Sequence, residues 1–267
     1  MVSEFLFGEL LDSDEEFKDW IHIAPPAREE EPDLFTVIPS FPAGSREKLE
    51  GWVLKSSVTE VDDAYCESYI SIQESGSMPV VRDRVAIVHN CNSYGSIVIP
   101  VNSMIPEYNA ADSSFTIGTD RYEFLTPFAH EETSAVEEAE IRKKIYRTAL
   151  EFIGAPFRWR GLTPWGTDSE GLVYSILRNN VQNAPFTFQE CMKYGTILSF
   201  MEEASIGDIL LFSDTSGDVS HSGIYLGGDR VIHASGNVKI DRIDHQGIFA
   251  NDMKRYTHPL GMIISLF

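Results

Sequence analysis

The chain of 267 residues has few cysteines, no long apolar run and no recognisable targeting segment. Its three cysteines are far apart and lack the spacing of a metal site or a redox pair, so we interpret them as reduced thiols. No stretch approaches the roughly 18 apolar residues that predict a membrane-spanning helix. The first residues show no basic segment followed by an apolar run, so they do not resemble a signal peptide. The sequence therefore predicts a cytoplasmic protein without membrane attachment.

Basic residues are also scarce. Lys and Arg number 21 against 41 Asp and Glu, which gives a formal net charge of −20. Such a surface argues against binding to nucleic acid or anionic lipid and favours a cationic or amine-bearing ligand. The phosphate-binding patterns GxxxxGK and GxGxxG are absent, as is the zinc-peptidase pattern HExxH. We therefore expect no nucleotide, no metal and no other cofactor.

The first 130 residues consist of short alternating apolar and polar runs separated by turn residues. This pattern is typical of small β-barrels or sandwiches. The apolar runs fall into two groups, which predict one β-rich unit over residues 1–60 and a second over residues 61–130.

The pattern changes after residue 130. Ser134 and Glu137 form an S-x-x-E capping box, and apolar residues then recur at helical spacing up to a stop at Gly154. A second helix is predicted from Ser169. Strand-like runs follow from DILLF at residue 208 to GMIISLF at the end of the sequence. Helices followed by antiparallel strands predict an α+β domain over residues 131–267.

Two histidines lie in a predicted hairpin of this domain. If the chain folds back about Gly227, His221 lies opposite His233 and both side chains share one face of the sheet. One imidazole can then act as a base for a nucleophile while the other orients it. The alternatives are a pair of structural histidines, or a zinc site that also uses His245, which the spacing does not favour.

Four segments carry a family resemblance: GAPFRWRGLTPWGTDSEGLVY, IGDILLF, HSGIYLGG and RVIHAS. In order and spacing they resemble the NlpC-type family of papain-like cell-wall cysteine peptidases, over about residues 140–245. The resemblance implies a papain-like fold with His221 as the base and His233 as the third catalytic residue. The segments FLFGELLD and EGWVLKSS are similar to strands of the bacterial SH3-like barrels that accompany some members. Both amino-terminal units are therefore expected to be such barrels.

The helix that should carry the nucleophile departs from the family. Its pattern is Asp-Cys-Ser-Gly-Leu, whereas this chain has Asp168, Ser169 and Glu170 before the Gly-Leu pair. Arg160 also stands where the family prefers glycine. Three departures at one site fit natural divergence better than one deliberate Cys-to-Ser replacement, which would explain Ser169 alone.

The resemblance also implies a ligand. In members that sense a free amine, the two residues that flank the nucleophile accept hydrogen bonds from the substrate's ammonium group. The matching positions are Asp168 and Glu170, and we expect Trp159 and Ser220 to complete the substrate-binding set. The implied ligand is a peptidoglycan stem peptide or muropeptide fragment that begins with L-Ala-γ-D-Glu and a diamino acid.

Serine at the nucleophile position favours a pseudo-peptidase that binds this peptide without cleaving it. A thiol begins near pKa 8.5 and ionises readily at a helix N-terminus, whereas a hydroxyl does not. The alternative is a γ-D-glutamyl-diamino-acid endopeptidase of cell-wall turnover, either active through Ser169 with His221 and His233 or deliberately inactivated. A protein partner for the same surface is a further alternative. Cys191 is better explained as a buried thiol than as a substitute nucleophile.

Overall fold

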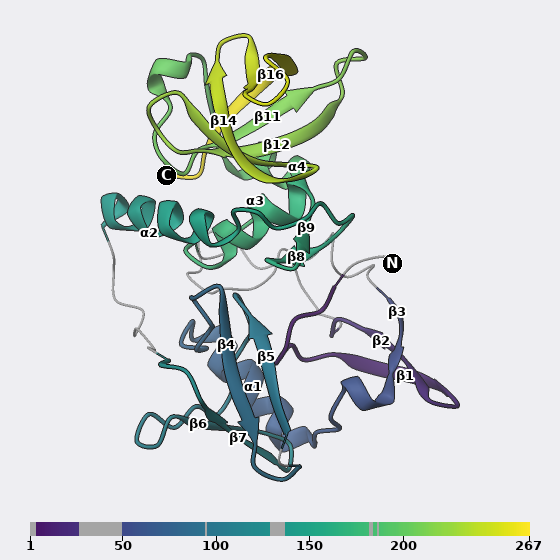
Figure 1. Cartoon of the computed structure of the whole chain (residues 1–267). Coiled ribbons are helices and arrows are strands. Elements are labelled where there is room, and N and C mark those ends of the chain that lie inside the picture. The colour runs from purple at the N-terminus through teal and green to yellow at the C-terminus, as the bar shows by residue number, and fades with distance from the viewer. Residues whose placement is uncertain (1–3, 27–49, 94, 129–136, 182–183, 186) are drawn as a thin grey trace. The chain divides into compact units, whose positions relative to one another are not determined.

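The structure is a computed structural model that describes residues 4–26, 50–93, 95–128, 137–181, 184–185 and 187–267. The chain forms two compact units, residues 2–134 and residues 135–267, drawn in Figure 1. Ser134, the first residue of the predicted capping box, lies outside the described residues. Within the described part of the chain, no helix combines the length and the apolar character needed to cross a bilayer.

The amino-terminal unit contains two antiparallel sheets, with strand orders β1-β2-β3 and β5-β4-β7-β6. A helix, α1 (Asp63–Glu74), separates them in sequence, and the carboxylate of Asp62 caps it by accepting from the backbone N–H of Tyr65. This helix lies at the start of the range predicted as a second barrel, and the SH3-like assignment of both ranges stays a prediction. The strands are β1 (Asp12–Phe17), β2 (Trp20–Ala24), β3 (Gly51–Leu54), β4 (Val85–Asn90), β5 (Gly95–Pro100), β6 (Ser114–Ile117) and β7 (Asp120–Phe124), with a 3-10 turn at Lys55–Ser57.

A closed ring of six antiparallel strands forms the centre of the carboxy-terminal unit. Each strand from β11 to β15 pairs with the next, and β16 pairs with both β11 and β15. The ring surrounds an apolar core that includes Phe212, Val231 and Ile248. Its strands are β11 (Ile209–Ser213), β12 (Val219–Tyr225), β13 (Arg230–Ser235), β14 (Asn237–Asp244), β15 (Gly247–Ala250) and β16 (Arg255–Ser265). A short strand, β10 (Thr196–Leu198), pairs with β16 from outside the ring.

Helices precede this ring in sequence and cover part of it, as Figure 1 shows for α2 and α3. The predicted α+β order is therefore confirmed, and α3 begins at Ser169 as expected. The first helix was expected from the capping box to Gly154 but is shorter at both ends. The bounds are α2 (Glu138–Glu151), α3 (Ser169–Arg178) and α4 (Phe188–Tyr194), with a small hairpin of β8 (Leu162–Thr163) and β9 (Gly166–Thr167) and a 3-10 turn at Met201–Glu203.

The predicted register of the β12–β13 hairpin is wrong by two residues. His233 pairs with Gly223 rather than with His221. The turn contains three consecutive residues with positive φ, Gly227, Gly228 and Asp229, so the chain reverses one position later than assumed. An even shift keeps every side chain on its face, and the two histidines still point to the same side of the sheet.

Two glycines set how closely α3 approaches the preceding loop. A Cβ atom at Gly171 would lie 2.0 Å from the carbonyl oxygen of Gly161, and one at Gly161 would lie 2.3 Å from that of Gly166. The hydroxyl of Thr167 donates to the same Gly161 carbonyl at 3.0 Å. The first turn of α3 is therefore held against the loop by backbone contact that only glycine permits.

We expect Gly171→Ala to destabilise the carboxy-terminal unit by about 1–3 kcal/mol, because backbone atoms must move apart. At an unobstructed helix position the same change would stabilise by about 1 kcal/mol, so the sign of the effect tests the contact. Urea unfolding followed by circular dichroism measures it. Gly51→Ala is a suitable control because nothing lies within 4 Å of the added Cβ. A stabilised Gly171→Ala variant would contradict the close packing.

Candidate functional site

A chain of hydrogen bonds joins three buried side chains inside the six-stranded ring. Nε2 of His221 on β12 lies 2.9 Å from Nδ1 of His233 on β13. Nε2 of His233 lies 3.1 Å from a carboxylate oxygen of Asp241 on β14. His221 pairs with Phe212 and Asp241 pairs with Val231, both members of the ring's core, so the three polar groups share its inner face.

The carboxylate determines the direction of these hydrogen bonds. Burial alone would raise the pKa of Asp241, but hydrogen bonds from His233 and the Asn251 amide, with the charge of Lys239, hold that pKa below its ordinary value. An ionised carboxylate only accepts, so His233 carries its proton on Nε2 and accepts at Nδ1. His221 must then donate from Nε2, which leaves Nδ1 of a neutral His221 as a free lone pair. This is the tautomer that a general base requires.

Burial also determines the charge of the histidines. It lowers the pKa of His221 well below the ordinary value of 6.5, and the nearby His258 and His233 lower it further. The pKa of His258 is lowered for the same main reason, with the nearby His233 and Lys239 contributing and Asp241 opposing. Both imidazoles are therefore held in the neutral form that can accept a proton or bind a ligand.

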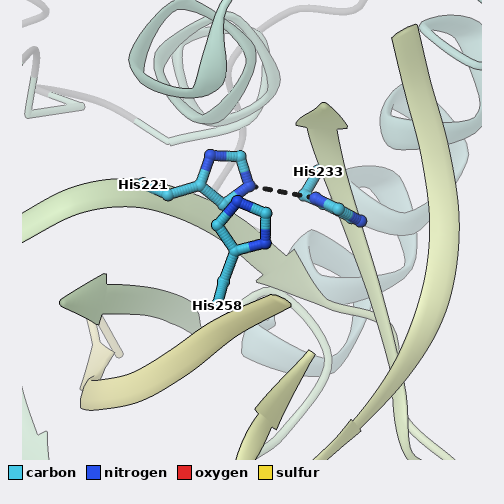
Figure 2. Close-up of side chains that lie close together, drawn as sticks. All are labelled: His221, His233 and His258. Atoms are coloured by element: carbon cyan, nitrogen blue, oxygen red, sulfur yellow. Dashed lines mark hydrogen bonds between the residues drawn. The ribbon is translucent and has the colours of Figure 1, made fainter. Parts of the chain in front are cut away.

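His258 on β16 is a third histidine of this cluster. Its ring stacks on that of His221 with centroids 4.2 Å apart and an interplanar angle of 25°, and Figure 2 shows both rings beside His233. Nδ1 of His258 lies 2.9 Å from the hydroxyl oxygen of Thr257. His245, which belonged to the zinc alternative that the spacing did not favour, lies exposed in the turn between β14 and β15. His258 pairs opposite Ile248 and thereby faces the inside of the ring.

Ser169 occupies the first position of α3, which packs against β12 and β13. The side chain is buried, and the backbone carbonyl of Ser169 accepts a 2.9 Å hydrogen bond from the Ser222 hydroxyl. This bond ties the head of the helix to the residue next to His221. Among the residues that the structure describes, no hydrogen bond joins the Ser169 hydroxyl to the His221 imidazole.

Asp168 caps α3 and organises the loop before it. One carboxylate oxygen accepts from the Gly171 N–H at 2.8 Å, and the other accepts from the Arg160 N–H at 2.7 Å. Arg160 has φ of +58°, in the left-handed region where glycine is preferred. An exposed arginine therefore adopts a backbone conformation that is more typical of glycine. Each oxygen of Asp168 keeps accepting capacity for another donor.

Glu170 follows Ser169 and is partly buried. Burial raises the pKa of Glu170, the neighbouring Asp168 raises it further, and a hydrogen bond from the Phe188 backbone and the charge of Arg160 act against this. Two carboxylates thus lie at the N-terminus of α3, and the helix dipole favours their negative charge there. They form an acidic site that suits a cationic group.

The other predicted residues are accessible, apart from the cysteine. The side chain of Trp159 is 66% exposed, and that of Ser220 is also exposed. Ser220 is the extra residue of a bulge where the pairing of β11 with β12 shifts. Cys191 lies buried in α4, where burial above all raises the pKa of its thiol to about 12. A thiol of this kind is not a reactive nucleophile.

Asp241 and His258 are the residues that the sequence reasoning missed. The position of Asp241 could have been predicted, because a hairpin about Gly236 pairs Asp241 with Val231. Val231 lies two residues from His233 on the same face of β13, so the carboxylate lies diagonally opposite His233. His258 pairs with Ile248 across the neighbouring β15–β16 hairpin, but its approach to His221 also depends on β16 pairing with β11, which is distant in sequence.

Part of the chain matches a known protein family. Residues 154–256 match the model of the NlpC/P60 family. Over 240 residues the chain is 21% identical to the gamma-D-glutamyl-L-lysine dipeptidyl-peptidase of Bacillus subtilis, covering 87% of this chain and 71% of that protein. Over 137 residues it is 34% identical to dipeptidyl-peptidase 6 of Lysinibacillus sphaericus, covering 49% of this chain and 46% of that one.

A solved structure of an NlpC/P60 family protein from Bacillus cereus has the same fold. It superposes with a TM-score of 0.65 at 17% identity and covers 96% of this chain and 80% of its own. The carboxy-terminal unit is thus a papain-like α+β domain, with helices packed on an antiparallel sheet. More specifically, this chain carries an NlpC/P60 family domain, the family of peptidoglycan hydrolase-like proteins.

Because His221 and His258 have lowered pKa values, we expect the stability of the fold to depend on pH. The pKa values of His221 and His258 are lowered by folding, so the unfolded chain binds more protons below about pH 6.5. Above about pH 6.5 the two histidines do not lower the free energy of unfolding. As the pH falls below this value the free energy of unfolding decreases, by up to about 1.4 kcal/mol per pH unit for each fully buried group. Urea unfolding between about pH 7 and pH 5.5 should show this decline, and His221→Gln should reduce its slope. An equal slope in both proteins would contradict a neutral His221.

Proposed function

We propose that this chain is a catalytically impaired NlpC-type protein that binds a peptidoglycan stem peptide by its free amino end. The ligand is L-Ala-γ-D-Glu linked to a diamino acid. The observation that carries the proposal is the head of α3, where Ser169 stands without a hydrogen bond to His221 and is flanked by Asp168 and Glu170. The assignment of residues 1–60 and 61–130 to SH3-like barrels and a cytoplasmic location belong to the same proposal.

Chemistry at the head of α3 supports impaired catalysis. A thiol at a helix N-terminus beside a neutral imidazole can transfer its proton and attack as a thiolate. The helix dipole supplies at most about 2 kcal/mol, little more than one pKa unit, so it cannot ionise a serine hydroxyl. Ser169 would have to lose its proton during attack. The neighbouring Glu170 carboxylate disfavours the negative charge that develops at that moment.

The residues at the head of α3 suit recognition of an amine better than they suit catalysis. Asp168 is fixed by two backbone hydrogen bonds, and Glu170 lies two residues away at the same helix end. An ammonium group between them would make charge-assisted hydrogen bonds and would offset the repulsion that raises the pKa of Glu170. The net charge of −20 adds long-range attraction for a cation. Similarity to the gamma-D-glutamyl-L-lysine dipeptidyl-peptidase of Bacillus subtilis supports the γ-D-glutamyl class of ligand.

An active enzyme is the second candidate, and the tautomer of His221 is the observation in its favour. The chain from Asp241 through His233 leaves Nδ1 of His221 free to accept a proton. With Ser169 attacking, the amide that follows D-Glu would be cleaved through an acyl-enzyme. The acyl-enzyme forms only if the protein is an active enzyme, so its detection distinguishes the enzyme from the peptide-binding protein. If the head of α3 instead serves to bind a protein partner, the protein should show no affinity for the tripeptide.

Restoring the family's sequence should restore cleavage if only the nucleophile is at fault. We expect no hydrolysis of the tripeptide by the unaltered protein, and release of L-Ala-γ-D-Glu by Ser169→Cys combined with Glu170→Ser. Mass spectrometry of the products and of the protein measures both cleavage and any acyl adduct. Adding His221→Ala to this variant should abolish the activity. An acyl adduct on Ser169 of the unaltered protein would establish the enzyme instead.

Binding tests the role of the carboxylates separately from catalysis. We expect Glu170→Gln to weaken calorimetric binding of the tripeptide by about tenfold, equal to about 1.4 kcal/mol, because a charged partner of the ammonium is lost. Acetylating the amino end of the peptide should weaken binding to the unaltered protein in the same way. The two changes together should cost little more than either alone. Full additivity would contradict a contact between Glu170 and the amine.

A further inference from the structure

The histidine cluster offers more than a relay for a base. His221, His233 and His258 come from three strands of the ring, and one side-chain nitrogen of each lies within 4.8 Å of those of the others. Figure 2 shows the three imidazoles gathered at one point. The hydrogen-bonded relay from Asp241 runs through His233 and His221, whereas His258 stacks on His221 beside it.

We propose that His221, His233 and His258 form a three-histidine site for a divalent transition-metal ion, with Zn²⁺ as the reference ion. Imidazole nitrogen is a preferred ligand of zinc, and three histidines with an open fourth position make a recognised site type. Zn–N bonds of 2.0–2.1 Å place ligand nitrogens about 3.3 Å apart in a tetrahedron. The hydrogen-bonded pair of His221 and His233 must therefore open slightly from 2.9 Å, and the longest spacing, at most 4.8 Å, must shorten by no more than about 1.5 Å.

The surroundings suit a metal ligand set. Asp241 accepts from Nε2 of His233 and so aims Nδ1 of that ring at the cluster. A carboxylate behind a ligating histidine fixes the ring and raises its basicity toward a metal. Nδ1 of His258 contacts Thr257, which leaves Nε2 of His258 for the cluster. Burial keeps His221 and His258 neutral, which is the form that coordinates.

Metal binding and the base relay exclude each other. The hydrogen bond between His221 and His233 must break, because the metal takes the lone pairs of the two nitrogens that it joins. The proton on Nε2 of His221 moves through solvent to Nδ1 of the same ring, so the neutral imidazoles release no net proton. His258 must also turn out of its stack on His221, because a metal lies in the plane of each ring that it binds.

The positive charge of Lys239 near the cluster is offset by two carboxylates. Lys239 lies 3.9 Å from the carboxylate of Asp241 but is also paired with Asp252 at 2.8 Å. The chain as a whole is strongly acidic, which concentrates cations around it. The proposed metal site contains neither Ser169 nor the two carboxylates of α3, so it is independent of the proposed function.

Calorimetric titration of chelator-treated protein with Zn²⁺ tests the site. We expect one ion per chain, and roughly tenfold or greater loss of affinity in His258→Gln. His245→Gln is the matched control, since it removes an exposed histidine of the same unit, and its affinity should be unchanged. Absence of a 1:1 complex, or equal affinity in His258→Gln and the unaltered protein, would overturn the proposal.

A second measurement needs no variant and guards against misfolding of His258→Gln. In long-range ¹H–¹⁵N spectra of the unaltered protein, Zn²⁺ should shift the ring nitrogens of His221, His233 and His258 together at one equivalent. The ring signals of His245 should stay in place. Shifts at His245 without shifts in the cluster would place the ion on the surface and refute the site. Peptide binding by the zinc-free protein reports on the proposed function independently.

Discussion

A buried carboxylate accepts hydrogen bonds but donates none, and this property of Asp241 fixes the protons of the whole cluster. Nε2 of His233 faces the carboxylate and must donate, so Nδ1 of His233 must accept from His221. Two imidazoles that would each populate two tautomers are thereby reduced to one arrangement. The ring of six strands makes this possible, because β12, β13 and β14 are adjacent and present alternate residues to a shared interior.

Local sequence signals predicted the elements that carry the site. Helical periodicity gave α2 approximately, and the family motif gave the start of α3 at Ser169. Alternation gave the strands, and it kept His221 and His233 on one face although the turn was placed one residue early. His258 was beyond such reasoning, because no local pattern says that β16 pairs with strands on both sides of the ring. Contacts between distant segments are decided by packing, which leaves no short-range signal.

Backbone contacts hold the head of α3 in shape. Asp168 accepts from two backbone amides, and neither bond depends on the residue at position 169. Arg160 adopts a left-handed conformation, which costs a residue other than glycine about 1–2 kcal/mol. The loop is thus held in shape by its carboxylate and by the glycine contact at α3 rather than by local preference. Such a scaffold tolerates a change of the side chain at position 169 without loss of the fold.

The closing strand has a consequence for how the protein is made. β16 follows every other strand of the ring in chain order, so a ribosome delivers it last of the six. Until then β11 and β15 have unpaired edges, and such edges invite pairing with other chains. The same strand brings His258, so closure of the ring and completion of the histidine cluster are one late, non-local event in biosynthesis. Nascent chains stalled before residue 255 would expose an open sheet to the quality-control machinery of the cell.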